Sequence, residues 1–80
     1  MKIDDVLNIK NVGIIVTGTV KDGEIKTGDT AVVNGKEFEV ENIQSYKKNI
    51  DTAPAGIDIG IKLKAIAKED VNSGDLLQVK

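Results

Sequence analysis

Cysteine, histidine, arginine and tryptophan are all absent from this chain of 80 residues, and each absence excludes a kind of chemistry. Without cysteine there is no disulfide, no thiol nucleophile and no thiolate ligand for a metal. Without histidine there is no imidazole that could act as a base near neutral pH or bind zinc. The remaining residue types form no catalytic set. We therefore expect a non-enzymatic protein with no catalytic residue, no metal site and no cofactor.

Aromatic residues and long apolar runs are scarce as well. Phe38 and Tyr46 are the two aromatic residues, which leaves little surface for stacking on nucleic-acid bases. The longest apolar run, at 14–16, is far too short to cross a bilayer, and the N-terminus begins with charged residues instead of a signal segment. We expect a soluble chain that does not enter a membrane. The lack of cysteine favours a cytoplasmic location.

The charge of the chain limits the kind of partner that it can bind. There are 13 acidic residues against 11 basic ones, a net charge of −2, and every basic residue is a lysine. Proteins that bind nucleic acid through bulk electrostatics are usually basic, and arginine supplies the two-pronged contact to phosphate and guanine. The composition therefore argues against tight autonomous binding of nucleic acid.

Short apolar stretches separated by turn residues run through the whole chain. The clearest is 57–63, where isoleucine and leucine alternate with other residues, as in a strand with one buried face. No segment has the periodicity of an amphipathic helix, although 68–71 suits one helical turn. The pattern predicts one all-β domain over 1–80, a small closed antiparallel β-barrel of about six strands. Its strands are expected at 3–9, 12–20, 24–26, 30–33, 36–44, 57–63 and 76–79.

Glycine and asparagine mark the tightest turns. Asn34-Gly35 is the strongest hairpin signal, and Asp22-Gly23 also suits a two-residue type I′ turn. Gly18 lies within a strand, where glycine indicates a bulge or the close approach of another backbone. The apolar alternation shifts phase after Val40, which predicts a bulge near Asn42.

The predicted core follows from the same alternation, because successive strand residues face opposite sides of a sheet. Glu37, Glu39 and Glu41 fall on the outer side, where charged residues deter pairing with other sheets. Residues 45–55 are expected to form a surface segment. The inward set is Val16, Val20, Val32, Phe38, Val40, Ile59, Ile61 and Leu63.

Three motifs follow one another in an order typical of one protein family. The motifs are GTVKDGEIKTGD at 18–29, AGIDIG at 55–60 and KEDVNSGDLL at 68–77. With these motifs the chain closely resembles the β-barrel second domain of translational GTPases, elongation factor Tu above all. No phosphate-binding loop of the G-x-x-x-x-G-K-[ST] type is present, so this domain alone is not expected to bind nucleotide. The resemblance implies an isolated module that packs on a GTPase domain in its relatives and contacts RNA.

The resemblance also implies a binding site, since the family's barrel holds the aminoacylated end of transfer RNA or touches ribosomal RNA. The chain departs from the family pattern at several of these positions, with Gln, Asp and Lys at 44, 58 and 62 in place of an acidic residue, Asn and Leu. We expect no preference for an aminoacylated end. The RNA- or partner-binding residues that the resemblance implies are Leu7, Ile9, Ile15, Thr17, Gln44, Tyr46, Lys47, Lys48, Asp58 and Lys62.

Two functions from different classes remain open. The first is a binding module of the translation-factor type, whose partner is ribosomal RNA, transfer RNA or a translation-related protein. Its contacts are expected mainly at Tyr46, Lys47 and Lys48. The second is a protein-interaction or scaffold domain with no RNA role, which the acidic charge and the altered site favour.

Overall fold

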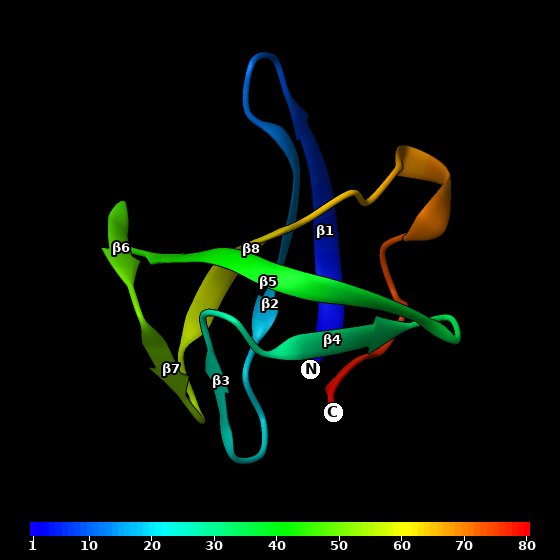
Figure 1. Cartoon of the computed structure of the whole chain (residues 1–80). Coiled ribbons are helices and arrows are strands. Elements are labelled where there is room, and N and C mark those ends of the chain that lie inside the picture. Colours follow the sequence, from blue (N-terminus) through cyan, green and yellow to red (C-terminus); the bar gives the residue numbers. More distant parts are fainter.

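The computed structural model describes residues 1–80 and consists of short β-strands and one 3-10 turn (Figure 1). The predicted all-β class is confirmed, and the expected helical turn is present as η1. No helix is long and apolar enough to cross a membrane. The elements are β1 (Lys2–Ile9), β2 (Gly13–Thr19), β3 (Glu24–Lys26), β4 (Thr30–Val33), β5 (Lys36–Ser45), β6 (Lys48–Ile50), β7 (Thr52–Pro54), β8 (Asp58–Leu63), η1 (Lys68–Asp70) and β9 (Leu77–Val79).

Seven strands form one antiparallel sheet in which β1, β2, β8, β5, β4 and β9 follow one another, with β6 paired to β5. β3 and β7 form a separate antiparallel pair. Figure 1 shows the strands wrapped around a common interior, with the N- and C-termini side by side. The amino group of Met1 donates to the Leu77 carbonyl at 2.7 Å, which fixes the start of the chain beside β9.

The two end strands of the large sheet approach each other without forming a full ladder. An isolated bridge joins Lys2 to Leu76. The Ile3 N–H donates to the Asp75 carbonyl at 2.8 Å, and the Gly74 N–H donates to the Ile3 carbonyl at 2.7 Å. The paired strands still form an open path from β1 to β9, so the predicted closure into a barrel is not confirmed.

Sixteen buried apolar side chains form the core. Val32 was predicted among them, but it is only half-buried, whereas Ala31 and Val33 are fully buried. The register explains this error. Ala31 lies opposite Phe38, and residues directly opposite on neighbouring strands share a face, so an inward Phe38 requires an inward Ala31. The predicted core residues that are confirmed are Val16, Val20, Phe38, Val40, Ile59, Ile61 and Leu63.

Of the two predicted hairpin turns, one is confirmed and one is wrong. Asn34 and Gly35 have φ of 53° and 79° and join β4 to β5, as a type I′ turn requires. Gly23 also has a positive φ, of 68°, but Asp22 does not, and β2 and β3 do not pair with each other. The segment around Asp22-Gly23 instead carries the chain from the large sheet to the β3–β7 pair.

Both irregularities predicted within strands are present. A Cβ on Gly18 would overlap the backbone carbonyl oxygen of Lys2, so only glycine allows β1 to approach β2 at this point. The register between β5 and β8 shifts between Val40 and Asn42. Glu41 is the extra residue of this bulge, and a bulge changes the direction in which such a residue's side chain points.

The expected surface segment at 45–55 is exposed or half-buried except at Ala53, and it contains two short strands that the sequence did not predict. β6 returns along β5 after a two-residue turn, and β7 pairs with β3. Ala53 of β7 is fully buried opposite Ile25. β6 and β7 have three residues each, too few to show a period of two, and no pair of flanking turn signals marks them as the turns at Gly23 and Gly28 mark β3.

Candidate functional site

Seven of the ten residues implied by the family resemblance lie on one face of β1, β2, β8 and β5, and the other three lie at the turn between β5 and β6. One cross-strand row runs from Leu7 through Ile15 to Lys62. The neighbouring row runs from Thr17 through Gly60 to Gln44. Because directly opposite residues share a face, positions far apart in the sequence form one continuous surface.

A pocket of about 150 Å³ opens on this face. Gly60 keeps it open, because a Cβ there would lie 3.2 Å from Cγ2 of Ile15. Typical ligand pockets hold roughly 300–1,000 Å³, so this one suits a single ring or a short side chain and not a whole cofactor. Apolar residues of β1, β2 and their connection line one side, and amides of β5 line the other. The lining residues are Ile9, Val12, Ile15, Asn42, Gln44, Gly60 and Lys62.

Three amides are linked along the β5–β6 side of the pocket. Asn42 Nδ2 and Gln44 Nε2 both donate to Oδ1 of Asn49, at 3.3 and 3.1 Å. Sharing one acceptor fixes the orientation of both lining amides, and their own oxygens remain available as acceptors. This side of the pocket can therefore accept hydrogen bonds from donor groups of a ligand.

The one cation that lines the pocket is already paired. Nζ of Lys62 lies 3.1 Å from Oε2 of Glu41, the extra residue of the β5 bulge. Glu39 pairs in the same way with Lys64 at 3.2 Å. Because Glu41 neutralises Lys62, the pocket itself has little attraction for a phosphate group.

The turn between β5 and β6 presents an aromatic ring next to two cations. Tyr46 is 85% exposed, and Lys47 and Lys48 are also exposed. Five other lysines form ion pairs, but neither of these two does. Tyr46 and Lys47 both have left-handed backbones, with φ of 51° and 66°.

Polar groups at the other end of the face are used in contacts between strands. Thr19 Oγ1 donates to the carboxylate of Asp58, and Ser45 Oγ donates to the Asp58 carbonyl at 3.2 Å. Thr17 Oγ1 donates to the Asp5 carbonyl at 3.3 Å. No three acidic side chains in the molecule lie close enough together to hold a metal ion.

The structure adds residues that the sequence did not mark as part of this site. Val12 is 44% exposed and joins the 42% exposed Ile9 on the apolar side of the pocket. Asn49 orients the two lining amides, and Gly60 creates the space. Of these residues, only Gly60 stands out in the sequence, because it lies between Asp58 and Lys62 at the outward positions of the 57–63 alternation and has no side chain.

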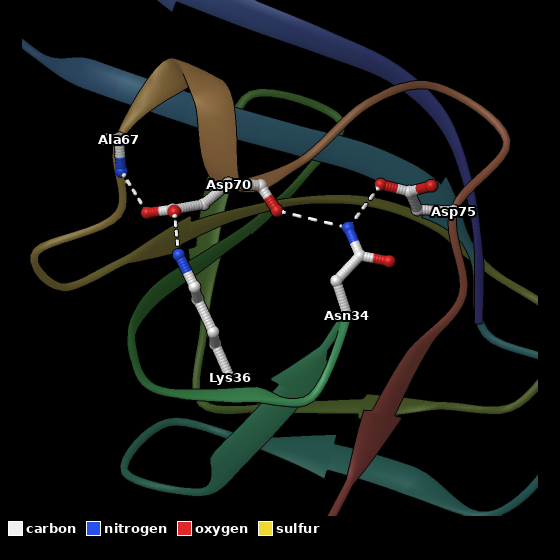
Figure 2. Close-up of polar contacts among 5 residues, drawn as sticks. All are labelled: Asn34, Lys36, Ala67, Asp70 and Asp75. Carbon is white, nitrogen blue, oxygen red and sulfur yellow. Dashed lines mark hydrogen bonds and ion pairs between the residues drawn. The ribbon is translucent and has the colours of Figure 1, made fainter.

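A second polar cluster ties the β4–β5 hairpin to η1 and to the loop before β9 (Figure 2). Asn34 Nδ2 donates to the Asp70 carbonyl at 3.2 Å and to Oδ2 of Asp75 at 2.9 Å. Lys36 Nζ lies 2.8 Å from Oδ1 of Asp70, and the Ala67 N–H donates to Oδ2 of Asp70 at 2.9 Å. The hydrogen bonds from Lys36 and Ala67 lower the pKa of Asp70, and the bond to Asp70 raises the pKa of Lys36.

The motifs and this fold agree with a known family. A family model described as Elongation factor Tu domain 2 matches residues 13–78. The chain belongs to this family. One relative of this domain, elongation factor 1-alpha from Pyrobaculum aerophilum, is 38% identical over 79 residues, which cover 96% of this chain and 18% of the relative. Elongation factor 1-alpha from Pyrobaculum islandicum is 37% identical, with the same coverage of both chains.

A solved structure shows that the whole chain adopts this fold. The crystal structure of translation elongation factor SelB from Methanococcus maripaludis, in its apo form, matches with a TM-score of 0.91 and 30% sequence identity. The match covers 100% of this domain and 18% of that chain. The chain therefore spans about a fifth of the length of the relatives that it matches.

Proposed function

We propose that this elongation factor Tu domain 2 is a non-enzymatic binding module, one domain over residues 1–80, which contacts ribosomal or transfer RNA. The contact surface is the face that carries the pocket, together with the turn between β5 and β6. The proposed location is the cytoplasm, where translation takes place.

The observation that carries this proposal is the position of Tyr46, Lys47 and Lys48. They form an exposed tip that joins the end of β5, which also supplies Gln44 to the pocket. Ammonium groups without an acidic partner can contact phosphates, and an exposed ring can pack on a ribose or base. Family membership supports an RNA partner for this surface.

The same surface is expected to bind weakly and without a preference for an aminoacylated RNA end. Gln44, Asp58 and Lys62 differ from the family pattern, and Asp58 places a carboxylate beside Thr19 at the edge of the face. Lys62 is held by Glu41. With only two unpaired lysines at the tip, dissociation constants of roughly 10⁻⁴–10⁻⁶ M, typical of nonspecific binding, are expected.

The test is a titration of the labelled domain with a short single-stranded RNA, followed by NMR chemical shifts. Shifts are expected at 44–48 and along the pocket. The variant Lys47→Glu/Lys48→Glu should lose binding and keep its melting temperature, because both side chains are exposed and unpaired. Lys21→Glu/Lys68→Glu makes the same change in net charge at two other exposed, unpaired lysines, and it should bind like the parent.

Two results would contradict the RNA role. One is the absence of any shift at millimolar RNA. The other is an equal loss of binding in both double variants, which would mean that net charge and not this tip controls the affinity.

A protein partner is the second candidate, and one observation favours it. Leu7, Ile9 and Val12 are each at least 40% exposed and lie together on β1 and its turn into β2, in a chain of net charge −2. Exposed apolar side chains that cluster mark interaction surfaces. Capture of a translation-related protein that is lost in Leu7→Ser/Val12→Ser, without RNA binding by the parent, would favour this function.

The non-enzymatic part of the proposal has its own test. The sequence has no phosphate-binding loop of the kind that GTPases use, so the purified domain is expected to hydrolyse no GTP. Turnover that persists through purification and disappears with one side-chain substitution would contradict it.

A further inference from the structure

Asn34-Gly35 is the only place in the chain where glycine follows asparagine. The backbone nitrogen after an asparagine can attack that residue's own side-chain carboxamide, and glycine permits this attack best because no Cβ obstructs the approach. Each of the other asparagines precedes a residue with a side chain, at Asn8, Asn11, Asn42, Asn49 and Asn72. The β4–β5 turn therefore carries a reactive pair of groups that no other asparagine in the chain has.

The structure leaves the nucleophile of this pair free. The Gly35 N–H makes no hydrogen bond within the protein, because it lies between the paired residues Val33 and Lys36 and outside the ladder. A Cβ built on Gly35 would have no atom within 4 Å, so no neighbouring group covers this side of the turn. Both residues of the turn are exposed. Solvent thus reaches the nitrogen and can accept its proton.

The carboxamide of Asn34, in contrast, is held in place. Its Nδ2 donates to the Asp70 carbonyl at 3.2 Å and to Oδ2 of Asp75 at 2.9 Å (Figure 2). Nδ2 is the atom that would leave as ammonia, so both hydrogen bonds have to break before the reaction is complete. The bond to the Asp75 carboxylate is of the stronger, charge-assisted kind. The two acceptors therefore slow a reaction to which the sequence of the turn is prone.

We propose that Asn34 is a site of spontaneous covalent modification whose rate is controlled by these two hydrogen bonds. The Gly35 nitrogen gives up its proton and bonds to Cγ of Asn34, while the Cγ–Nδ2 bond breaks and Nδ2 leaves as ammonia with that proton. Water then opens the resulting five-membered imide ring at one of its two carbonyl carbons. Opening at Cγ gives aspartate, and opening at the backbone carbonyl gives isoaspartate. This chemistry does not depend on the proposed RNA role.

Either product keeps the hairpin from remaking its contact. A carboxylate at position 34 accepts hydrogen bonds and donates none, so it would meet the Asp75 carboxylate and the Asp70 carbonyl with repulsion in place of two bonds. Isoaspartate also adds a methylene to the main chain, in a turn that has only two residues between Val33 and Lys36. The modification is thus a one-way change of this part of the fold.

The effect is expected to reach beyond the turn, because Asp75 also helps to hold the two end strands of the large sheet together. Its carbonyl accepts from the Ile3 N–H at 2.8 Å, and its carboxylate accepts from the Asn72 N–H at 2.8 Å. The neighbouring Gly74 N–H donates to the Ile3 carbonyl at 2.7 Å. Without the Asn34 contact, this loop loses its link to the β4–β5 hairpin through Asp75. The modified domain should therefore open more readily between β1 and the loop before β9.

The test follows the full chain in neutral buffer below its melting temperature, with peptide mapping by mass spectrometry to locate each modified asparagine. Asn11 is the internal control, because it is exposed and has a positive φ of 69° but is followed by valine. Asp75→Ala removes one of the two acceptors of Nδ2. Ile61→Val removes a buried methyl group outside the cluster and lowers stability without touching Asn34.

In the parent, modification is expected at Asn34 and not at Asn11. Asp75→Ala should modify Asn34 about 10-fold faster or more, the factor that one hydrogen bond to a charged acceptor is worth. Ile61→Val should react at the parental rate. The parent unfolded in urea should react fastest, because none of the contacts of Asn34 remains.

Two further variants compare the product with a matched change of charge. Asn34→Asp places the carboxylate directly, and it should lower the melting temperature by about 4–8 °C and speed the hydrogen exchange of the Ile3 and Gly74 amides. Asn11→Asp makes the same change of net charge at an exposed position in the turn between β1 and β2, and it should melt like the parent.

Any of three results would overturn the proposal. If Asn34 stays intact in the folded parent and in Asp75→Ala while the chain unfolded in urea reacts, the turn itself prevents the attack. If Ile61→Val reacts as fast as Asp75→Ala, global unfolding and not the contact with Asp75 sets the rate. If Asn34→Asp melts like Asn11→Asp, the modification has no structural effect.

Discussion

Two glycines on neighbouring strands show how single residues shape this domain. Gly18 of β2 is directly opposite Ile59 of β8, and Gly60 of β8 is directly opposite Thr17 of β2. Gly18 faces the interior, where the backbone of Lys2 occupies the space of a side chain. Gly60 faces the pocket. The sequence predicted the close approach at Gly18, because a glycine inside a strand of β-branched residues weakens that strand unless another backbone needs the space.

These glycines are expected to respond differently to alanine. In Gly18→Ala the new Cβ meets a backbone carbonyl, which cannot rotate away, so the free energy of unfolding should fall by about 1–3 kcal/mol. In Gly60→Ala the neighbour is the side chain of Ile15 at 3.2 Å, which is only half-buried and can move. The entropy gain from replacing glycine, about 0.5–1 kcal/mol, should leave Gly60→Ala close to neutral. Urea unfolding of both variants measures the difference. Equal losses would mean that β1 can move away from Gly18.

At the scale of elements, the sequence predicted strands wherever apolar alternation and a glycine turn coincide. The strand at Thr30–Val33 agrees with the prediction residue by residue, and the bulge before Asn42 was visible as a shift in alternation. The prediction that Val32 faces inward was wrong. Residues 31–33 are all apolar, so the sequence does not show which of them face the core, and the pairing with β5 decides it.

The candidate site was harder to predict than the strands. The family resemblance supplied Ile15, Gln44 and Lys62, and the structure places all three around one pocket. Asn49 could not be predicted, since its role comes from β6, a three-residue strand without a periodic signal. The pairing of Lys62 with Glu41 depends on a bulge, which shifts every later residue by one position along the neighbouring strand.

The contacts of Asp70 predict how acid affects the stability that the fold gains from the polar cluster between η1 and the β4–β5 hairpin. The hydrogen bonds from Lys36 and Ala67 lower the pKa of Asp70 below 3.8. A lowered pKa in the folded state means that this carboxylate stabilises the fold above its unfolded pKa, and the contribution is lost as pH falls through the folded pKa. Lys36 has a raised pKa, so its contribution is present below 10.5 and is lost as pH rises through the folded pKa.

Melting temperatures measured between pH 2 and pH 7 test this prediction. The parent should lose stability below about pH 4 more steeply than Asp70→Asn, which has no carboxylate to protonate at this position. Lys36→Met should reduce the effect without removing it, because the Ala67 N–H still bonds to Asp70. Parallel pH profiles for the parent and Asp70→Asn would contradict the prediction.

For the whole molecule, the arrangement of charge is more informative than its sum. Ion pairs use all three carboxylates of β5: Glu37 pairs with Lys80 at 2.9 Å, Glu39 with Lys64 at 3.2 Å and Glu41 with Lys62 at 3.1 Å. The chain is acidic as a whole, yet the tip at Lys47 and Lys48 has no carboxylate paired to it. An acidic protein can thus present a local cationic surface to RNA. The salt dependence of its RNA affinity should show how many lysines contact phosphates.

The last prediction concerns Glu41, which neutralises the cation beside the pocket. Two phosphates at Lys47 and Lys48 give a slope of about −1.4 in a plot of log affinity for single-stranded RNA against log salt concentration. Glu41→Gln frees Lys62, so the slope should steepen to about −2.1, and the affinity at low salt should rise about two- to fivefold. Glu39→Gln is the matched control. It makes the same change of charge and frees Lys64, which does not line the pocket, so its slope should stay near that of the parent. Equal slopes for Glu41→Gln and Glu39→Gln would show that Lys62 does not reach the RNA, and the bound strand would then lie along the β5–β6 turn alone.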